Sequence, residues 1–368
     1  MELHFCTLFH HKGFVLMNQI ILNDIPSLCR VFAGQKTLLV CGSFFEQLPL
    51  AIDLTALNPV RFSGFSSNPL YEDVCRGVQL FRDEKCSAIV AIGGGSSLDV
   101  AKCIKLFAAM DPEIHYLKQP YPDSSVPLAA IPTTAGTGSE ATRHAVIYFN
   151  GEKQSISHTG IIPNYICLIP GLLDTLPLYQ KKCTMLDALC QAIESWWSVS
   201  STEESTQFSR QAIIAIRDHW KEYLEKGTPE ASENIMMAAY HSGRAINITA
   251  TTAAHAMSYK LTSLYRIPHG HAVALCIQNV WEYMLHHMEE CIDPRGEAHL
   301  KAVFAELPVD LDWFLDLMKA LNMDHPLPGN RTEELDILAA SVNPVRLKNN
   351  PVALRTDTIR AMYDDILL

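Results

Sequence analysis

The stretch AIGGGSSLDVAK, Ala91 to Lys102, decides the fold class of this chain. It joins the end of an apolar run to three glycines and then to a helical pattern, which predicts a buried strand, a tight turn and a helix. Glycines let the backbone approach a diphosphate, and the first turn of a helix offers free N–H groups and the positive end of its dipole. The stretch lacks the G-x-G-x-x-G pattern, so a plain glycine turn stays open as the alternative to a phosphate-binding turn.

The flanking sequence repeats this alternation of strand and helix. KTLLVCG (36–42) and LAAI (128–131) are short apolar runs that predict buried strands, and YEDVCRGVQLFRDEKC (71–86) has apolar residues at helical spacing. Such alternation predicts a doubly wound α/β domain with a parallel sheet. From Leu178 onward the signals are mostly helical. We therefore predict an α/β dinucleotide-binding domain over residues 1–175 and an α-helical metal and substrate domain over residues 176–368.

A second loop of small residues follows the strand predicted at 128–131. The segment PTTAGTGSE (132–140) carries four hydroxyl side chains among its glycines: Thr133, Thr134, Thr137 and Ser139. A flexible polar loop is the alternative interpretation. Because both loops follow buried parallel strands, we expect them at the carboxyl edge of the sheet, where ligands of open α/β sheets bind. Together the two loops favour nucleotide binding.

The helical half contains a candidate metal site. In TMLDALCQAIESWW (184–197), Asp187 and Gln191 lie four residues apart and therefore on one helical face. The segment AAHAMSYKLTSLYRIPHGHAVAL (253–275) carries His255, His269 and His271 among small residues that permit close packing. With Asp187 and Gln191 supplied from another helix, the set could be one aspartate, one glutamine and two of these three histidines. Ordinary helix surface and packed core histidines are the alternatives.

Composition limits the partners and the compartment. The chain has 368 residues, a net charge of −11 and no basic run, which argues against nucleic acid as a partner. No apolar run is long enough to span a bilayer. Eleven dispersed cysteines without a C-x-x-C pair predict reduced thiols and a cytoplasmic protein. Translation starts at Met1 or at Met17.

Five segments occur in order along the chain: GGGSSLDVAK, PTTAGTGSEAT, LDALCQAIE, HAMSYKLTSLYRIPHGHAVAL and NPVALRTDTIRAMYDDIL. Together they resemble the iron-containing (group III) alcohol dehydrogenase family, from about residue 18 to the C-terminus. Within this family, DALCQAIESWWSV joined to TTAAHAMSYKLTSLYRIPHGHAVAL is similar to the phosphonoacetaldehyde reductases of phosphonate biosynthesis.

The resemblance implies a dehydroquinate synthase-like architecture, in which a Rossmann-like α/β domain precedes an all-α domain. It also implies a homodimer, NAD(H) or NADP(H) as cofactor, and a divalent metal, Fe²⁺ with Zn²⁺ or Mn²⁺ as alternatives. Carried over by motif, the cofactor-binding residues are Gly94, Gly95, Ser96, Asp99, Thr133, Thr134, Thr137, Ser139 and Lys153. For Lys153 an exposed hairpin lysine is the alternative.

The sequence departs from the family pattern at three places. The resemblance implies Asp187, His255 and His269 as metal ligands, with Gln191 in the place of a further histidine ligand. The neutral carbonyl oxygen of Gln191 is a weaker donor to the metal than imidazole. Tyr259 replaces a histidine of the family's proton relay. Gly42 and Ser43 end the first strand where many NAD-using members carry an aspartate that repels a 2′-phosphate. The sequence therefore favours NADPH, with NADH as the alternative.

The expected reaction is hydride transfer between NAD(P)H and a small aldehyde, phosphonoacetaldehyde in the narrower interpretation, giving 2-hydroxyethylphosphonate. His271 and Tyr259 are the candidates that help a proton to the aldehyde oxygen. An anionic substrate needs positive charge or N–H donors. Alternation in the predicted strand EATRHAVIYF (140–149) places Thr142 and His144 on one face, and Lys260 and Arg266 flank the helix with His255. Solvated surface charges are the alternative for these residues.

Three other functions stay open from the sequence. The first is a metal-dependent alcohol dehydrogenase acting on an uncharged short alcohol or aldehyde. The second is a lyase or cyclase related to dehydroquinate synthase. The third is a non-catalytic nucleotide-binding protein that has lost its metal, for which Gln191 is the only support.

Overall fold

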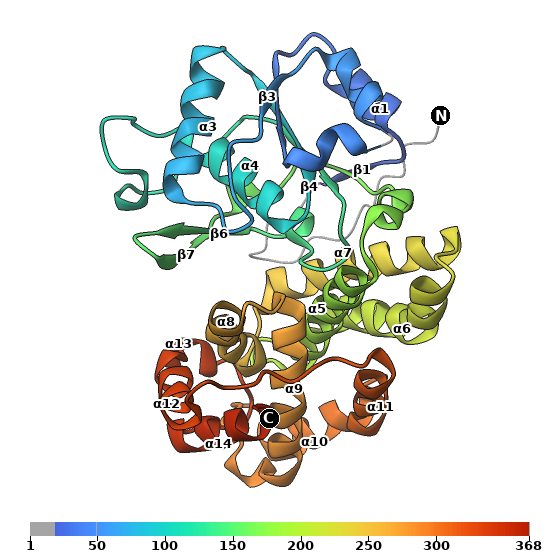
Figure 1. Cartoon of the computed structure of the whole chain (residues 1–368), viewed down its shortest axis with the longest axis vertical. Coiled ribbons are helices and arrows are strands. Elements are labelled where there is room, and N and C mark those ends of the chain that lie inside the picture. The colour runs from blue at the N-terminus through green and yellow to red at the C-terminus, as the bar shows by residue number, and fades with distance from the viewer. Residues whose placement is uncertain (1–18, 49, 368) are drawn as a thin grey trace. The chain divides into compact units, whose positions relative to one another are not determined.

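The computed structural model describes residues 19–48 and 50–367, so both candidate start residues, Met1 and Met17, lie outside the described residues (Figure 1). The chain divides into two compact units. One comprises the chain up to Thr133 together with Arg143–Ile169, and the other comprises Thr134–Thr142 together with Pro170–Leu368. The short threonine-rich segment 134–142 thus groups with the helical unit. The domain boundary at 175/176 stays a prediction.

The first unit is built on a parallel sheet. Within the described residues, its six strands have the order β1-β8-β5-β4-β2-β3, and each pair of neighbours is parallel. The central strands β2, β4 and β5 are buried along their whole length, as expected for a sheet covered on both faces. The strands are β1 (Ile20–Leu22), β2 (Thr37–Cys41), β3 (Val60–Phe62), β4 (Ala88–Gly93), β5 (Leu128–Pro132) and β8 (Tyr165–Cys167).

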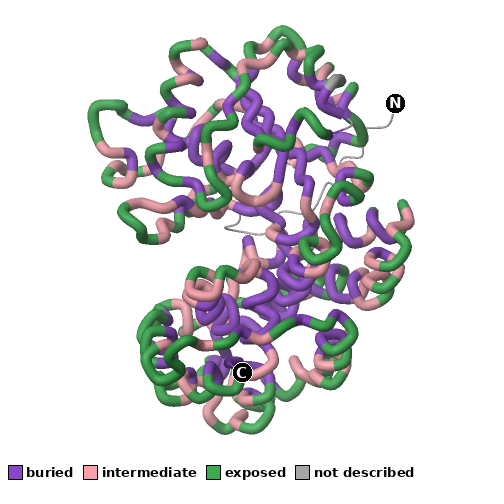
Figure 2. Tube along the Cα trace, in the orientation of Figure 1, coloured by how far each residue is buried: buried purple, intermediate pink, exposed green. Residues whose placement is uncertain are grey.

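Helix α4 (Gly95–Phe107) forms the central part of the hydrophobic core of this unit. It packs against α3 (Tyr71–Asp83) and against strands β2, β4 and β5. A Cβ at Gly77 of α3 would lie 2.4 Å from the Ile104 side chain, so glycine allows the two helices to approach. Figure 2 shows the buried strands of this unit in purple. The unit also contains α1 (Ile25–Val31) and α2 (Ala51–Leu54). The predicted strand, glycine turn and helix at Ala91–Lys102 are confirmed.

A two-stranded antiparallel hairpin follows the threonine-rich segment. It consists of β6 (His144–Phe149) and β7 (Glu152–Ser157), joined by Asn150 and Gly151, which both have positive φ angles, 52° and 77°. The predicted strand over 140–149 is too long. Ser139–Ala141 forms a 3₁₀ helix and Thr142 is its C-cap. The alternation that placed Thr142 and His144 on one strand face is therefore wrong, because Thr142 lies outside the strand.

The second unit is helical, as predicted. Helices α5, α6 and α7 pack on one another, and α5 also packs on α9, which packs on α8. Helix α9 starts directly after Pro268, and Trp281 of α9 contacts Trp197 of α5 edge to face. The helices are α5 (Leu178–Trp197), α6 (Glu203–Glu225), α7 (Pro229–Thr249), α8 (Ala253–Tyr265), α9 (His269–His286), α10 (Glu297–Glu306), α11 (Leu311–Leu321), α12 (Arg331–Ser341), α13 (Pro344–Leu347) and α14 (Thr356–Ile366).

Two further expectations concern cysteines and membranes. Each of the ten cysteines in the described part of the chain is free, and most are buried. Among the described helices, none is both long enough and apolar enough to cross a membrane.

Candidate active site

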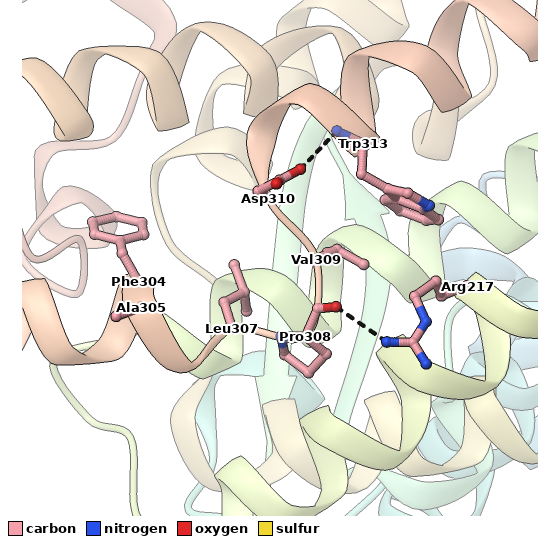
Figure 3. Close-up of a pocket in the computed structure, with 8 residues that line it drawn as sticks. All are labelled: Arg217, Phe304, Ala305, Leu307, Pro308, Val309, Asp310 and Trp313. Carbon is pink, nitrogen blue, oxygen red and sulfur yellow. Dashed lines mark hydrogen bonds between the residues drawn. The ribbon is translucent and has the colours of Figure 1, made fainter.

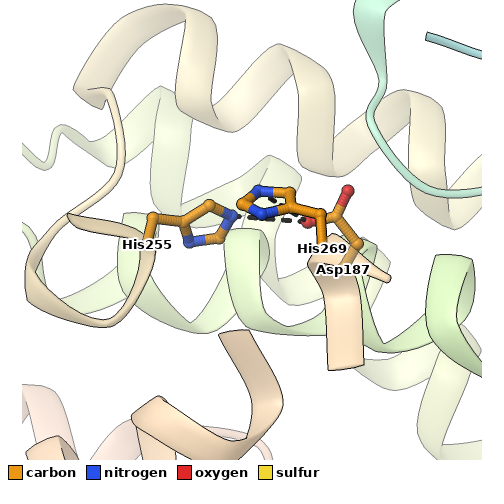
Figure 4. Close-up of side chains that lie close together, drawn as sticks. All are labelled: Asp187, His255 and His269. Atoms are coloured by element: carbon orange, nitrogen blue, oxygen red, sulfur yellow. Dashed lines mark ion pairs between the residues drawn. The ribbon is translucent and has the colours of Figure 1, made fainter. Parts of the chain in front are cut away.

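Three of the four predicted metal ligands meet in the helical unit. Asp187 comes from the middle of α5, His255 from the first turn of α8, and His269 is the first residue of α9 (Figure 4). One ligand atom from each lies within 4.8 Å of the others. Asp187 Oδ1 is 3.4 Å from His255 Nε2 and 3.9 Å from His269 Nε2. Side chains from three separate helices therefore converge on one point.

Gly270 brings these helices together. A Cβ at this position would lie 1.9 Å from the carbonyl oxygen of Cys183 and 2.8 Å from Cβ of Asp187. Only glycine lets the first turn of α9 rest directly on the backbone of α5. This contact places His269 beside Asp187, and it confirms the expectation that small residues near the histidines permit close packing.

The donor set fits a divalent metal. Asp187 Oδ1 and His255 Nε2 are buried and make no hydrogen bond within the described chain, although buried polar atoms are rarely left unpartnered. Two ligands held about 2.1 Å from one tetrahedral ion lie about 3.4 Å apart. The separation of Asp187 Oδ1 from His255 Nε2 has this value. One carboxylate and two imidazoles are a set that Fe²⁺, Zn²⁺ and Mn²⁺ all accept.

Glu194 is a functional residue that the sequence interpretation missed. Its side chain is fully buried, and Oε2 forms a short hydrogen bond with Nδ1 of His255. Oε1 accepts hydrogen bonds from the backbone N–H and hydroxyl of Thr252 and from the backbone N–H of His255. A carboxylate on the far nitrogen of a ligand histidine fixes the ring and makes the other nitrogen a stronger donor. Glu194 therefore orients His255 toward Asp187.

These contacts also set the charges of the group. Burial lowers the pKa of His255, but Glu194 and Asp187 outweigh burial and raise it to about 9. Burial raises the pKa of Asp187, but the two imidazoles outweigh burial and lower it below its ordinary value. The site between Glu194 and Asp187 thus favours a positive charge, and the proton on His255 supplies it. Metal binding has to displace that proton, which couples affinity for the metal to pH.

Gln191, the fourth predicted ligand, is placed differently from the other three. It is buried beside Asp187 on α5, and its Oε1 accepts a hydrogen bond of 2.7 Å from the Ser242 hydroxyl. The Gln191 side chain also helps to lower the pKa of the neighbouring Asp187 carboxyl. In this arrangement Gln191 holds Asp187 in place. A ligand role for its carbonyl oxygen requires the amide to rotate away from Ser242.

The two proton-relay candidates lie on α8 and α9. The Tyr259 ring stacks on His269, with ring centroids 5.6 Å apart and planes at 9°. His271 is buried, and its Nδ1 is 2.8 Å from the Tyr179 hydroxyl. Burial lowers the pKa of His271, which favours the neutral ring. Tyr259 is therefore the candidate in direct contact with a predicted ligand.

The predicted nucleotide loops follow strands β4 and β5, and the second loop passes from the first unit to the helical unit between Thr133 and Thr134. Gly94 is the N-cap of α4, so Gly95 and Ser96 form its first turn, and Thr133 N–H donates to the carbonyl of Gly93. In the helical unit, Gly138 has φ 57° and lies against Gly243 of α7, where a Cβ would be 2.5 Å from that Cα. The remaining hydroxyl residues belong to this unit: Thr134, Thr137 and Ser139.

The other predicted cofactor residues have the following contacts. The Ser96 hydroxyl donates to the carbonyl of Ser67, and Asp99 Oδ2 accepts the N–H of Val146 at 2.9 Å. Lys153 lies on strand β7. Gly42 is the N-cap of a 3₁₀ helix that begins with Ser43, immediately after β2. Asp99 thus supports the hairpin, and the residues directly after β2, Gly42 and Ser43, carry no carboxylate.

Two family models match successive parts of the chain. The model described as iron-containing alcohol dehydrogenase matches residues 14–170, and the model of the C-terminal part of Fe-containing alcohol dehydrogenases matches residues 182–367. The chain belongs to the iron-containing alcohol dehydrogenase family. The family resemblance and the fold class predicted from the sequence are thereby confirmed.

Individual members of the family show the range of relatives. A phosphonoacetaldehyde reductase of Streptomyces viridochromogenes is 34% identical over 242 residues, which are 62% of this chain and 61% of that protein. The chain thus matches about three fifths of the length of this relative. A 1,3-propanediol dehydrogenase of Citrobacter freundii is 30% identical over 72% of each protein. The crystal structure of sulfoacetaldehyde reductase from Bifidobacterium kashiwanohense in complex with NAD⁺ is 26% identical, with a TM-score of 0.84 over 96% of this chain and 99% of that one.

The four predicted substrate residues are divided between the two units. His144 lies at the start of β6 in the first unit, where its carbonyl accepts a hydrogen bond from Lys102. Thr142, Lys260 and Arg266 belong to the helical unit. Thr142 is buried, whereas Arg266 is exposed and caps the C-terminus of α8 with φ 55°. Their role toward a substrate stays a prediction.

A separate pocket of about 360 Å³ lies elsewhere in the helical unit (Figure 3). The Arg217 guanidinium donates to the Pro308 carbonyl at 3.3 Å and pairs with Asp218 at 2.8 Å, so its charge is already engaged. None of the predicted site residues lines this pocket, which is bounded by Arg217, Phe304, Ala305, Leu307, Pro308, Val309, Asp310 and Trp313. We therefore place the candidate active site at Asp187, His255 and His269.

Proposed function

We propose that the chain reduces small aldehydes with NADPH or NADH, and that phosphonoacetaldehyde, reduced to 2-hydroxyethylphosphonate, is its substrate. The observation that carries the proposal is the convergence of Asp187, His255 and His269, with two buried ligand atoms left without hydrogen bonds. A phosphonoacetaldehyde reductase at 34% identity and a sulfoacetaldehyde reductase at 26% identity support an aldehyde that carries an anionic group.

Asp187, His255 and His269 hold the metal in this proposal, with Fe²⁺ first and Zn²⁺ or Mn²⁺ as alternatives. When bound, the ion supplies Lewis-acid polarisation of the aldehyde oxygen, and the nicotinamide supplies the hydride. Glu194 keeps His255 in the tautomer that presents Nε2, and Gln191 keeps Asp187 in position. These two residues therefore support the ligands from behind.

The nucleotide is assigned to the two glycine-containing loops. The first turn of α4 offers the N–H groups of Gly95 and Ser96 to a diphosphate. Thr133, Thr134, Thr137, Ser139 and Lys153 are the further contacts that the family motifs assign. Gly42 and Ser43 present no carboxylate to a 2′-phosphate, which supports NADPH over NADH.

Two groups of residues complete the reaction. Tyr259, with His271 as the alternative, donates the proton that the aldehyde oxygen needs once hydride reaches the carbonyl carbon. At least one cation among His144, Lys260 and Arg266 binds the phosphonate, and Thr142 adds a hydroxyl. The overall balance is aldehyde plus NAD(P)H plus one proton giving alcohol plus NAD(P)⁺.

An aldehyde panel tests the proposal. Oxidation of NADPH and NADH is followed with phosphonoacetaldehyde, sulfoacetaldehyde, propanal and butanal at equal concentrations, with protein purified anaerobically and supplied with Fe²⁺. We expect the largest kcat/KM with phosphonoacetaldehyde. Equal or larger kcat/KM with propanal supports the second candidate, an alcohol dehydrogenase for uncharged short alcohols, which the 1,3-propanediol dehydrogenase relative favours. No net oxidation of either cofactor with any aldehyde would contradict both.

A further inference from the structure

The Arg346 guanidinium contacts Tyr259, whose ring stacks on the predicted ligand His269. Arg346 lies in the short helix α13, and its Nη1 donates a hydrogen bond of 3.3 Å to the Tyr259 hydroxyl. The Arg346 guanidinium carbon is also 5.2 Å from the centroid of the Tyr259 ring. The cation therefore contacts both the hydroxyl and the ring of the same tyrosine.

Tyr259 links this cation to the metal ligands. Its ring stacks on His269 at 5.6 Å between centroids. The guanidinium carbon is 5.2 Å from the Tyr259 ring centroid, and that centroid is 5.6 Å from the His269 centroid. The guanidinium carbon and the centre of the His269 ring are therefore at most about 11 Å apart. A two-carbon aldehyde with an anionic group spans a comparable gap when its oxygen lies at the ligands.

The position of Arg346 is fixed by the fold. Helix α13 packs on α8, and its N-cap Asn343 accepts the N–H of Val345. Just after α13, the Asn349 amide donates to the carbonyls of Thr249 and Thr251. Thr249 is the last residue of α7, and Thr251 lies in the connection from α7 to α8, the helix that carries His255. The segment with Arg346 is thus tied to the backbone that positions a ligand.

The charge of Arg346 is not neutralised by a carboxylate. Across residues 19–48 and 50–367, this half-buried side chain makes one hydrogen bond, to Tyr259, and no ion pair. Its neighbours in the same part of the chain differ, since Arg360 pairs with Asp336 and Arg355 pairs with Glu290. A guanidinium has five N–H donors in a planar fork that matches two oxygens of a tetrahedral oxyanion. Most of these donors are available to a ligand.

We propose that Arg346, in addition to the cation assigned above among His144, Lys260 and Arg266, binds the tetrahedral oxyanion of the substrate and so selects anionic aldehydes over uncharged ones. This inference rests on the proposed function and names the residue that reads its substrate class. Tyr259 acts as the platform that orients the guanidinium beside His269. The recognised chemistry is an oxyanion attached to the carbon next to the aldehyde, which phosphonoacetaldehyde and sulfoacetaldehyde share.

The test compares Arg346→Gln with wild type on phosphonoacetaldehyde, sulfoacetaldehyde and propanal. Loss of a charged hydrogen bond predicts a kcat/KM that falls about 10- to 100-fold on the anionic aldehydes, mainly through KM. The loss on the anionic aldehydes should exceed the loss on propanal by about 10-fold or more, because propanal carries no oxyanion, whereas a change at Tyr259 affects all three aldehydes alike. Arg346→Lys retains the charge without the fork and should lie between the two. Arg360→Gln, at a cation already paired, is the matched control and should behave as wild type.

Binding provides a second readout that does not depend on turnover. Calorimetric titration with 2-hydroxyethylphosphonate should show a Kd that rises about 10- to 100-fold in Arg346→Gln, with metal content and thermal unfolding as in wild type. The loss of kcat/KM in Arg346→Gln is then compared between phosphonoacetaldehyde and sulfoacetaldehyde. The aldehyde with the larger loss carries the oxyanion that Arg346 recognises.

Several outcomes would overturn the proposal. A variant that keeps the wild-type preference for anionic aldehydes and the wild-type Kd excludes Arg346 as the anion-binding residue, while the proposed function stands. An equal loss of kcat on propanal and on the anionic aldehydes means that Arg346 acts through Tyr259 alone. If wild type reduces propanal but neither anionic aldehyde, the proposed substrate is wrong, and the Kd for 2-hydroxyethylphosphonate still decides the role of Arg346.

Discussion

The Glu194 carboxylate lies against Nδ1 of His255, on the opposite side of the ring from Nε2, which faces Asp187. Carboxylate, imidazole and ligand carboxylate therefore form a continuous chain through the core of the helical unit. The backbone N–H groups of Thr252 and His255 hold the other Glu194 oxygen, so the carboxylate is fixed at both ends. This relationship gives the candidate metal site its rigidity.

Glu194→Gln tests the role of this carboxylate. The amide has the same size, but its neutral oxygen polarises His255 less, so we expect the Kd for Fe²⁺ or Zn²⁺ to rise about 10- to 100-fold. Competition with a chelator of known affinity measures it. Glu222→Gln, at an exposed residue that pairs with Lys226, is the control. An unchanged Kd in Glu194→Gln would show that His255 does not bind metal through Nε2.

Two substitutions test the role of Gln191 at the metal site. Gln191→Ala removes the side chain beside Asp187 and leaves the Ser242 hydroxyl without its acceptor, so metal affinity should fall about 10-fold. Gln191→His offers an imidazole in place of the amide, and we expect tighter binding because imidazole is the stronger donor. The same chelator competition measures both. If Gln191→His leaves affinity and activity unchanged, residue 191 does not reach the metal.

Gly270→Ala tests how α5 and α9 are brought together. The new methyl group would meet the carbonyl oxygen of Cys183 and the Cβ of Asp187, so the helices must separate. We expect a loss of about 1–3 kcal/mol in the free energy of unfolding, together with weaker metal binding. Gly171→Ala is the control, because nothing lies within 4 Å of a Cβ there. Equal stability of both variants in urea titrations argues against this close packing.

His241 predicts a pH dependence of stability away from the metal site. Burial and then Arg244 lower its pKa from 6.5 to about 4. Between these values the unfolded chain binds the proton and the folded chain does not, so stability falls as the pH drops from about 6.5 to 4. For a half-buried ring, this loss in the free energy of unfolding is on the order of 2 kcal/mol. Urea titrations of the chelated protein at pH 7 and pH 5 should show a smaller difference in His241→Gln, and an unchanged difference contradicts the assignment.

The sequence allowed prediction of the parts of the molecule that rest on local patterns. Continuous apolar runs marked the buried parallel strands β2, β4 and β5, and glycine follows the run of β2 and ends that of β4. The four-residue spacing of Asp187 and Gln191 and three histidines close together in the sequence indicated a metal site, and the resemblance to the family singled out His255 and His269. Glu194 had a similar signal that was not used, since it lies seven residues after Asp187 and so on the same helical face.

Other features had no local signal. Arg346 is 87 residues from Tyr259 in the chain and lies in a helix of four residues. Helix α9 is apolar on nearly every side, and such a run does not distinguish helix from strand. Thr142 was misplaced because the positive φ of Gly138 starts a 3₁₀ turn, which overrides the expected alternation. Long-range packing and backbone turns determine these features, and neither leaves a pattern in the local sequence.

The central claim is that Asp187, His255 and His269 hold a metal that the reaction requires. The most direct measurement is metal analysis of protein purified anaerobically, combined with NADPH-dependent reduction of phosphonoacetaldehyde, for wild type and Asp187→Asn. We predict one divalent ion per chain in wild type, activity that is lost with a chelator and restored by Fe²⁺, Mn²⁺ or Zn²⁺, and neither metal nor activity in the variant. Full activity in wild-type protein that contains no metal would contradict the account.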